Sequence, residues 1–354
     1  MIPAAFDYVQ ADSVEAALAA LTEHGDEAKL MAGGHSLLPM MKLRLAVPEV
    51  IVDIGRIDDL SYIREDGDEL AIGALTRHRV LESSDVLAQQ CPILKHVAHL
   101  VGDPQVRHRG TIGGSLSHSD PASDLPAACL ALGATLVAAR ADGSSRRIPI
   151  GDFYTGFLET TLDPTEMITE VGVPKRPGTS WNYQKFNRRA IDWAVVGVAA
   201  VMGNGSGGQP GVALVNMGST SIRAGATEEA LAQGATAADA AQLADADTEP
   251  PDDLNGSPEY RRHLVKVLTR RALLGARVAQ GGPADVPQRE RHTQCGQRHP
   301  VGDVTVRDQS PQVGDRHPLH PVGLVGVGRF PDVLGLGGHK DIKRLVARPV
   351  RRVV

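Results

Sequence analysis

The chain has 354 residues, 42% of them hydrophobic and only 3% aromatic, and its net charge is −5. That length suits two compact domains, because a single core stops growing near about 250–300 residues. The acidic balance argues against nucleic acid as a partner, and no apolar run approaches the roughly 20 residues of a spanning helix. Three scattered cysteines indicate neither a disulfide framework nor a metal cluster. We expect a cytoplasmic protein without a signal peptide.

The first 55 residues have the pattern of a βαβ unit. A capping-box pattern at residues 12–15 starts a helix, and a double glycine follows the first apolar strand. The expected elements are a helix that ends near Gly25, a strand over 28–31, a helix over 36–42 and a strand over 50–54. Strand, glycine turn, helix and strand make an α/β subdomain over about residues 1–55.

Two further regions follow, divided by the Pro- and Gly-rich linker at 174–178. In the second subdomain, over about 56–176, we expect strands at 70–73 and 134–138 and helices at 79–87, 91–101 and 127–132. In an α+β domain over 177–276, we expect strands at 181–188, 194–202 and 212–217, a hairpin turn at 203–211, and helices at 227–233 and 258–274.

The composition changes at Arg277. The last 78 residues hold 13 basic and 7 acidic side chains and a single aromatic, Phe330, whereas residues 1–276 carry a net charge of −11. Frequent Gly and Pro and little apolar surface predict a tail of low order. It is interpreted either as a disordered extension or as out-of-frame translation, both ahead of a nucleic-acid-binding arm, because its charges are scattered.

The double glycine at residues 33–34 is the first candidate site. Two glycines after a strand let a ligand approach the backbone, and successive N–H groups next to a helix start suit a pyrophosphate. For a lone Gly-Gly, a simple tight turn is the favoured interpretation, so this motif by itself decides little.

A second double glycine changes that balance. Residues 111–115, Thr-Ile-Gly-Gly-Ser, repeat the pattern, and Asp124 follows as a candidate acceptor for ribose or ribityl hydroxyls. Two such nests suit a dinucleotide gripped from both sides, although neither matches G-x-G-x-x-G or the P-loop.

These motifs resemble those of a known family. Ala-Gly-Gly-His-Ser-Leu-Leu-Pro at 32–39 and Arg-Gly-Thr-Ile-Gly-Gly-Ser-Leu-Ser-His-Ser-Asp-Pro-Ala-Ser-Asp-Leu-Pro-Ala at 109–127 resemble the two flavin motifs of the FAD-binding subunits of molybdenum hydroxylases. Within this family, they resemble in particular the medium subunits of aerobic carbon monoxide dehydrogenase. The resemblance runs from about Met1 to Ala276, and it implies a PCMH-type α/β FAD-binding domain over 1–176, in two subdomains, followed by the α+β domain.

The resemblance also implies which residues bind FAD. They are Ala32, Gly33, Gly34, His35, Ser36, Leu37, Thr111, Ile112, Gly113, Gly114, Ser115, Asp124, Ile168, Lys185 and Trp193. Trp193 stands where Tyr or Phe is more usual beside the isoalloxazine, and Ser115 where Asn is frequent. Each has a plainer interpretation: His35 as a turn spacer, Asp124 as a helix cap, Lys185 as a strand charge and Trp193 as core filler. His96 and His99 lack a third ligand, so no metal site is expected.

By resemblance, the chain is an electron-transfer subunit that passes electrons from an iron–sulfur small subunit to an external acceptor, while a large subunit with the molybdenum cofactor oxidises the substrate. Peripheral membrane association of the complex is left open. The alternatives are a FAD subunit of a purine or N-heterocycle hydroxylase and a non-catalytic FAD-binding protein. Neither the substrate nor the acceptor, quinone or nicotinamide, can be read from this chain.

Overall fold

The structure, a computed structural model, describes residues 2–203 and 209–276, so the expected tail and most of the hairpin turn at 203–211 lie outside the described residues. Its first sheet is parallel, in the order β1-β3-β2. The elements are β1 (Asp7–Gln10), α1 (Val14–His24), β2 (Ala28–Met31), α2 (Leu37–Lys42) and β3 (Val50–Asp53). Strands β2 and β3 flank α2, so the expected βαβ unit is present.

The second sheet is antiparallel and has the order β4-β5-β10-β6-β7. Its strands are β4 (Ile63–Asp66), β5 (Glu69–Gly73), β6 (Thr135–Ala139), β7 (Ser145–Pro149) and β10 (Met167–Pro174). Two short strands, β8 (Tyr154–Gly156) and β9 (Glu159–Thr160), pair separately. Short 3₁₀ turns lie at Gly25–Glu27, Asp58–Leu60 and Ile150–Asp152.

Six helices connect β5 to β6. They are α3 (His78–Ser83), α4 (Asp85–Gln90), α5 (Pro92–His99), α6 (Pro104–Arg109), α7 (Ile112–His118) and α8 (Asp124–Leu132). The helix expected over 79–87 is wrong as a single element. Ser84 ends α3 in an extended conformation, and its Oγ accepts a hydrogen bond from the Leu87 N–H at 3.1 Å, which starts α4.

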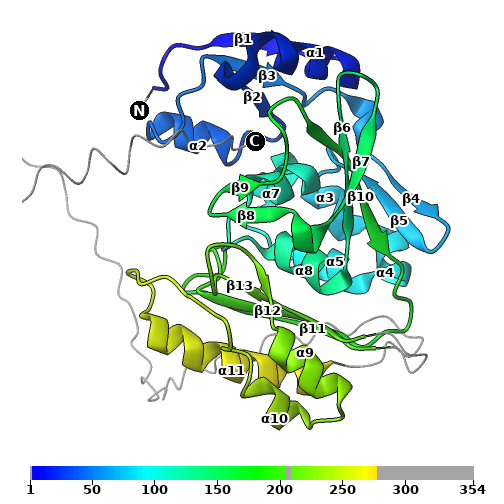
Figure 1. Ribbon diagram of the computed structural model, residues 1–354, viewed down its shortest axis with the longest axis vertical. Helices are drawn as coiled ribbons and strands as arrows, with labels where there is room; N and C mark the ends of the chain where they lie inside the picture. Colours follow the sequence, from blue (N-terminus) through cyan, green and yellow to red (C-terminus); the bar gives the residue numbers. More distant parts are fainter. Residues whose placement is uncertain (1, 204–208, 277–354) are drawn as a thin grey trace, which may run out of the picture. The chain divides into compact units, whose positions relative to one another are not determined.

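The third sheet is antiparallel, in the order β11-β12-β13-β14. Its elements are β11 (Trp181–Phe186), β12 (Val196–Val201), β13 (Gly211–Val215) and β14 (Ile222–Arg223), followed by α9 (Gly225–Ala232), α10 (Ala237–Ala241) and α11 (Pro258–Gly275). Helix α8 packs on one face and α11 on the other (Figure 1). Both faces of β12 are therefore buried, which explains why its six residues are all apolar. The predicted fold class, α/β followed by α+β, is confirmed.

An ion cluster ties β6, β7 and the start of β10 together. The Glu166 side chain is fully buried and accepts from Arg140 and Arg146, both at 2.8 Å, and from the Asp163 N–H at 2.8 Å. Burial acts to raise the pKa of Glu166, but Arg146, the Asp163 amide and Arg140 outweigh it and lower the pKa to about 2. The carboxylate is therefore ionised throughout the neutral range.

Candidate functional site

The first double glycine forms the turn between β2 and α2. Gly34 has a φ of +73°, a left-handed conformation that favours glycine, and the His35 Nδ1–H donates to the Gly33 carbonyl at 3.2 Å. Across residues 33–37, no backbone N–H donates a hydrogen bond to any described residue. Ser36 is the N-cap and Leu37 the first residue of α2, so their N–H groups have no intrahelical partner. Together with the preceding glycine turn, they form a series of free N–H groups of the kind that suits anionic oxygens.

The second double glycine is not a nest. Gly113 and Gly114 belong to the first turn of α7, which Thr111 caps by accepting from the Gly114 N–H at 3.1 Å. The N–H of Ile112 donates to the Thr76 carbonyl at 3.0 Å, and that of Gly113 donates to the Ala74 carbonyl at 2.8 Å. These three N–H groups therefore already have partners within the chain, and contact of this motif with a phosphate stays a prediction from the resemblance.

The two glycine segments nevertheless touch. A Cβ on Gly33 would lie 2.3 Å from the Arg109 carbonyl oxygen and 3.1 Å from the Gly110 Cα, so only glycine fits against this backbone. The missing side chain at Gly33 thus serves this packing contact, while access of a phosphate to its N–H stays a prediction. Arg77 secures the contact, since its guanidinium donates to the Arg109 carbonyl and, at 3.3 Å, to that of Gly55.

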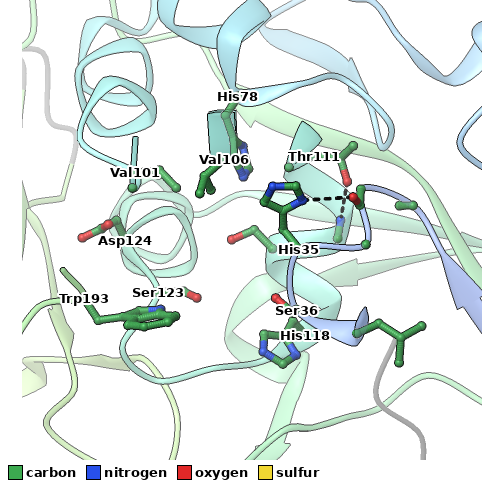
Figure 2. A pocket seen from close by; sticks show the side chains of 18 of the residues that line it. His35, Ser36, His78, Val101, Val106, Thr111, His118, Ser123, Asp124 and Trp193 are labelled. Carbon is green, nitrogen blue, oxygen red and sulfur yellow. Dashed lines mark hydrogen bonds between the residues drawn. The ribbon is translucent and has the colours of Figure 1, made fainter. Parts of the chain in front are cut away.

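A cavity of about 250 Å³ opens where these segments meet (Figure 2). Most of the predicted site residues line it: Ala32, Gly33, Gly34, His35, Ser36, Leu37, Thr111, Gly114, Ser115, Asp124, Lys185 and Trp193. Ile112 is buried in the core, while Gly113 and Ile168 line a separate, much smaller cavity. The sequence did not single out His78, Val101, Gly102, Val106, Gly110, Ser123, Ile191 and Asp192, which also line the main cavity.

One wall of the cavity is a buried ion pair. Asp124, the first residue of α8, accepts from the Lys185 ammonium at 2.7 Å and from the Tyr183 hydroxyl at 2.6 Å. Burial raises the pKa of Asp124, while Lys185 and Tyr183 favour its ionised form. The interpretation of Asp124 as a helix cap is wrong, because Ser123 occupies the N-cap. Lys185 is likewise no ordinary surface charge, since it is only 7% exposed.

Trp193 lies at the mouth of the cavity. Its side chain is 70% exposed, so the core-filler interpretation is wrong. It also lines a second cavity of about 720 Å³, together with Arg188, Arg189 and Phe157. The neighbouring Ile191 is 58% exposed as well. Two exposed apolar side chains therefore line the solvent side of the cavity, with Asp192 between them.

Two histidines face the cavity in neutral form. Burial, Arg107, Arg77 and His35 lower the pKa of His78 to about 4, and burial lowers that of His118, although Asp120 opposes the shift. Neither Nδ1 atom has a hydrogen-bond partner.

His96 and His99, the pair that was considered for a metal site, do not line the cavity, and neither does His108. His96 contacts the Trp181 ring, at 5.3 Å between ring centroids, and His99 pairs with Glu82 at 3.2 Å. His108 is exposed and contacts Arg79. Among the described residues there is no group of three or more His, Cys, Asp or Glu side chains placed to hold a metal ion. No helix within the same residues is long and apolar enough to cross a membrane.

Comparison with known proteins adds two family matches. The FAD binding domain in molybdopterin dehydrogenase matches residues 4–176, and the CO dehydrogenase flavoprotein C-terminal domain matches residues 181–276. The carbon monoxide dehydrogenase medium chain of Hydrogenophaga pseudoflava is 41% identical over 78% of this chain and 98% of the relative. The 6-hydroxypseudooxynicotine dehydrogenase complex subunit alpha of Paenarthrobacter nicotinovorans is 38% identical over 78% of this chain and 96% of the relative.

Solved structures agree with these matches. A structure of carbon monoxide dehydrogenase from Hydrogenophaga pseudoflava superimposes with a TM-score of 0.74 at 43% identity, covering 78% of this chain and 98% of that one. Quinoline 2-oxidoreductase from Pseudomonas putida 86 gives a TM-score of 0.72 at 32% identity, over 78% and 98% of the two chains.

Proposed function

The chain belongs to the family of FAD-binding medium subunits of molybdenum hydroxylases, and from this membership we propose that it is the electron-transfer subunit of a carbon monoxide dehydrogenase-type complex. As a member it is an oxidoreductase subunit that carries FAD. In the proposal, an iron–sulfur small subunit supplies electrons, a large subunit with the molybdenum cofactor oxidises the substrate, and an external quinone or nicotinamide is the acceptor. We also propose a cytoplasmic location, with peripheral membrane association of the complex left open.

The run of free N–H groups at residues 33–37 is the observation in this structure that supports the FAD site on which the proposal depends. All five residues line the cavity, and the diphosphate of FAD supplies the anionic oxygens that such donors require. The residues present therefore fit the cofactor. The chemistry that FAD supplies when bound is the reversible uptake and release of electrons.

The remaining residues have distinct proposed roles. Thr111, Gly114 and Ser115 form the facing wall, and Asp124 with Lys185 presents a polar edge to the cofactor's hydroxyls. Trp193 covers the entrance, where it limits access of water and of the acceptor. Cofactor contacts by Ile112, Gly113 and Ile168 stay predictions, because none of these residues lines the main cavity.

The proposed domain bounds are 1–176, in subdomains of about 1–55 and 56–176, and 177–276. The start of β11 at Trp181 supports a boundary near the linker. Residues 277–354 lie beyond both family matches.

Reconstitution tests the proposal. The full chain is co-expressed with the small and large subunits, and the isolated complex is treated anaerobically with carbon monoxide. The visible flavin absorbance should bleach in the complex and stay unchanged in the isolated chain. Failure of the three chains to associate, or bleaching of the isolated chain by the substrate, would overturn it.

A second substrate class has its own support. The 6-hydroxypseudooxynicotine dehydrogenase subunit is nearly as similar as the carbon monoxide dehydrogenase chain, at 38% against 41% identity, so similarity does not separate a gas from an N-heterocycle. The same complex should therefore also be treated with quinoline and nicotine. Bleaching by one of these and not by carbon monoxide would assign the complex to N-heterocycle hydroxylation.

A further inference from the structure

His78 is a cavity residue to which the function proposed above gives no role. It is the first residue of α3, and its backbone N–H donates to the Gly110 carbonyl at 3.0 Å. The side chain is only 4% exposed, yet it lines the main cavity. In Figure 2 the ring points from α3 toward His35.

The ring has no hydrogen-bond partner among the described residues. Its Nδ1 is sealed from solvent and unpartnered, and no side chain or backbone group bonds to Nε2. Buried polar side chains usually have partners, so an unpartnered imidazole in a cavity wall indicates a group that is missing from the protein itself.

Gly110 places this ring beside the free N–H groups of residues 33–37. A Cβ on Gly110 would lie 2.6 Å from Cδ2 and 2.7 Å from Nε2 of His78, so the ring edge lies directly on this glycine. Gly33 also lies close to Gly110, since a Cβ added to Gly33 would lie 3.1 Å from the Gly110 Cα. The imidazole and the proposed diphosphate-binding segment therefore share Gly110 as a common wall.

We propose that His78 is a further FAD-binding residue whose Nε2–H donates a hydrogen bond to the diphosphate. The inference rests on the proposed function, because it assumes that residues 33–37 hold this group. Placing the proton on Nε2 also avoids a buried Nδ1–H without an acceptor.

The charges around the ring keep it neutral, with one donor. Arg107 on α6, Arg77 at the N-cap of α3 and His35 on the first glycine segment face it, and with burial they lower its pKa to about 4. At neutral pH the ring is a directional donor and adds no further positive charge to the site.

FAD affinity of the full-length chain, freed reversibly of flavin, tests the assignment by fluorescence titration. His78→Leu removes the donor and should raise the Kd for FAD by about 10-fold to 100-fold, the range expected for a hydrogen bond to a charged group. His78→Gln keeps an N–H near the Nε2 position and should restore most of the affinity. His108→Leu, on the exposed face of α6, is the matched control and should bind as the wild type does.

The ³¹P resonances of bound FAD give a readout that a purely structural role would not move. They should shift in His78→Gln and stay in place in His108→Gln. Unchanged resonances in His78→Gln, or wild-type affinity in His78→Leu, would overturn the role of His78 alone. A wild-type chain that binds no stoichiometric FAD would instead overturn the proposed site.

Discussion

Replacing Lys185 by Met should destabilise the protein far more than the loss of a surface charge. The ammonium lies 2.7 Å from Asp124 and 3.1 Å from the Leu100 carbonyl, and the two charged side chains are only 7% and 6% exposed. The variant keeps an unbranched side chain that is one atom shorter, but it leaves a carboxylate buried without its cation. Breaking a buried ion pair in this way costs about 3–5 kcal/mol.

The cost should depend on pH in a defined direction. Burial already raises the pKa of Asp124, and without Lys185 nothing but the Tyr183 hydroxyl favours the ionised form. An acid whose folded-state pKa lies above its unfolded value loses stability as pH rises and regains it as pH falls toward about 4. The difference in unfolding free energy between wild type and Lys185→Met should therefore shrink from pH 7 to pH 5.

Urea unfolding of the FAD-free chain, followed by circular dichroism, measures this difference. Lys175→Met is the control, because Lys175 pairs at 2.7 Å with Glu65, which is 51% exposed, and should cost less than about 1 kcal/mol. Adding Asp124→Asn to Lys185→Met should recover much of the loss, since no unpaired charge then remains. A cost below about 1 kcal/mol for Lys185→Met, or strictly additive single variants, would refute the reasoning.

Three further predictions concern packing, acid stability and the tail. Gly33→Ala should lower the melting temperature and the FAD content, because its Cβ would lie 2.3 Å from the Arg109 carbonyl, whereas Gly225→Ala, with no atom within 4 Å, should change neither. Because its pKa is lowered to about 2, ionised Glu166 should stabilise the fold above about pH 4.5, and this stabilisation should be lost as the pH falls through about 2. The urea midpoint should therefore depend less on acid pH in Glu166→Gln than in the wild type. Truncation after Ala276 should leave melting temperature and FAD content unchanged.

Each has an outcome that contradicts it. Equal effects of the two glycine variants would mean that the contact between the glycine segments is unimportant. Glu166 can contribute at most about 3 kcal/mol to the unfolding free energy, and less because its arginine partners are 43% and 38% exposed. If Glu166→Gln and the wild type lose stability in acid to the same extent, Glu166 does not contribute to the acid dependence. A drop of several degrees on truncation would show that the tail packs.

The sequence alone determined the features that depend on neighbouring residues. The glycine turn after β2 and the all-apolar run of β12 are local signals, because turn conformation and periodicity act over a few residues. The capping box expected at residues 12–15 was displaced by one residue, since Ser13 caps α1 by accepting from the Ala16 N–H. The order of two glycine motifs was also enough to identify the family.

Tertiary structure decided what the motif residues do. The sequence indicated two equivalent phosphate cradles. In the structure, the N–H groups of Ile112 and Gly113 donate to carbonyls of the segment after β5, and those of Gly114 and Ser115 donate to Thr111. The N–H groups of residues 33–37 have no partner among the described residues. Asp124 and Lys185 are 61 residues apart, and Gly110 meets the ring of His78 only because α3 and α6 pack together. Such pairings arise from how helices pack on sheets, and no local pattern in the chain encodes them, since side chains distant in sequence meet only after the fold has formed.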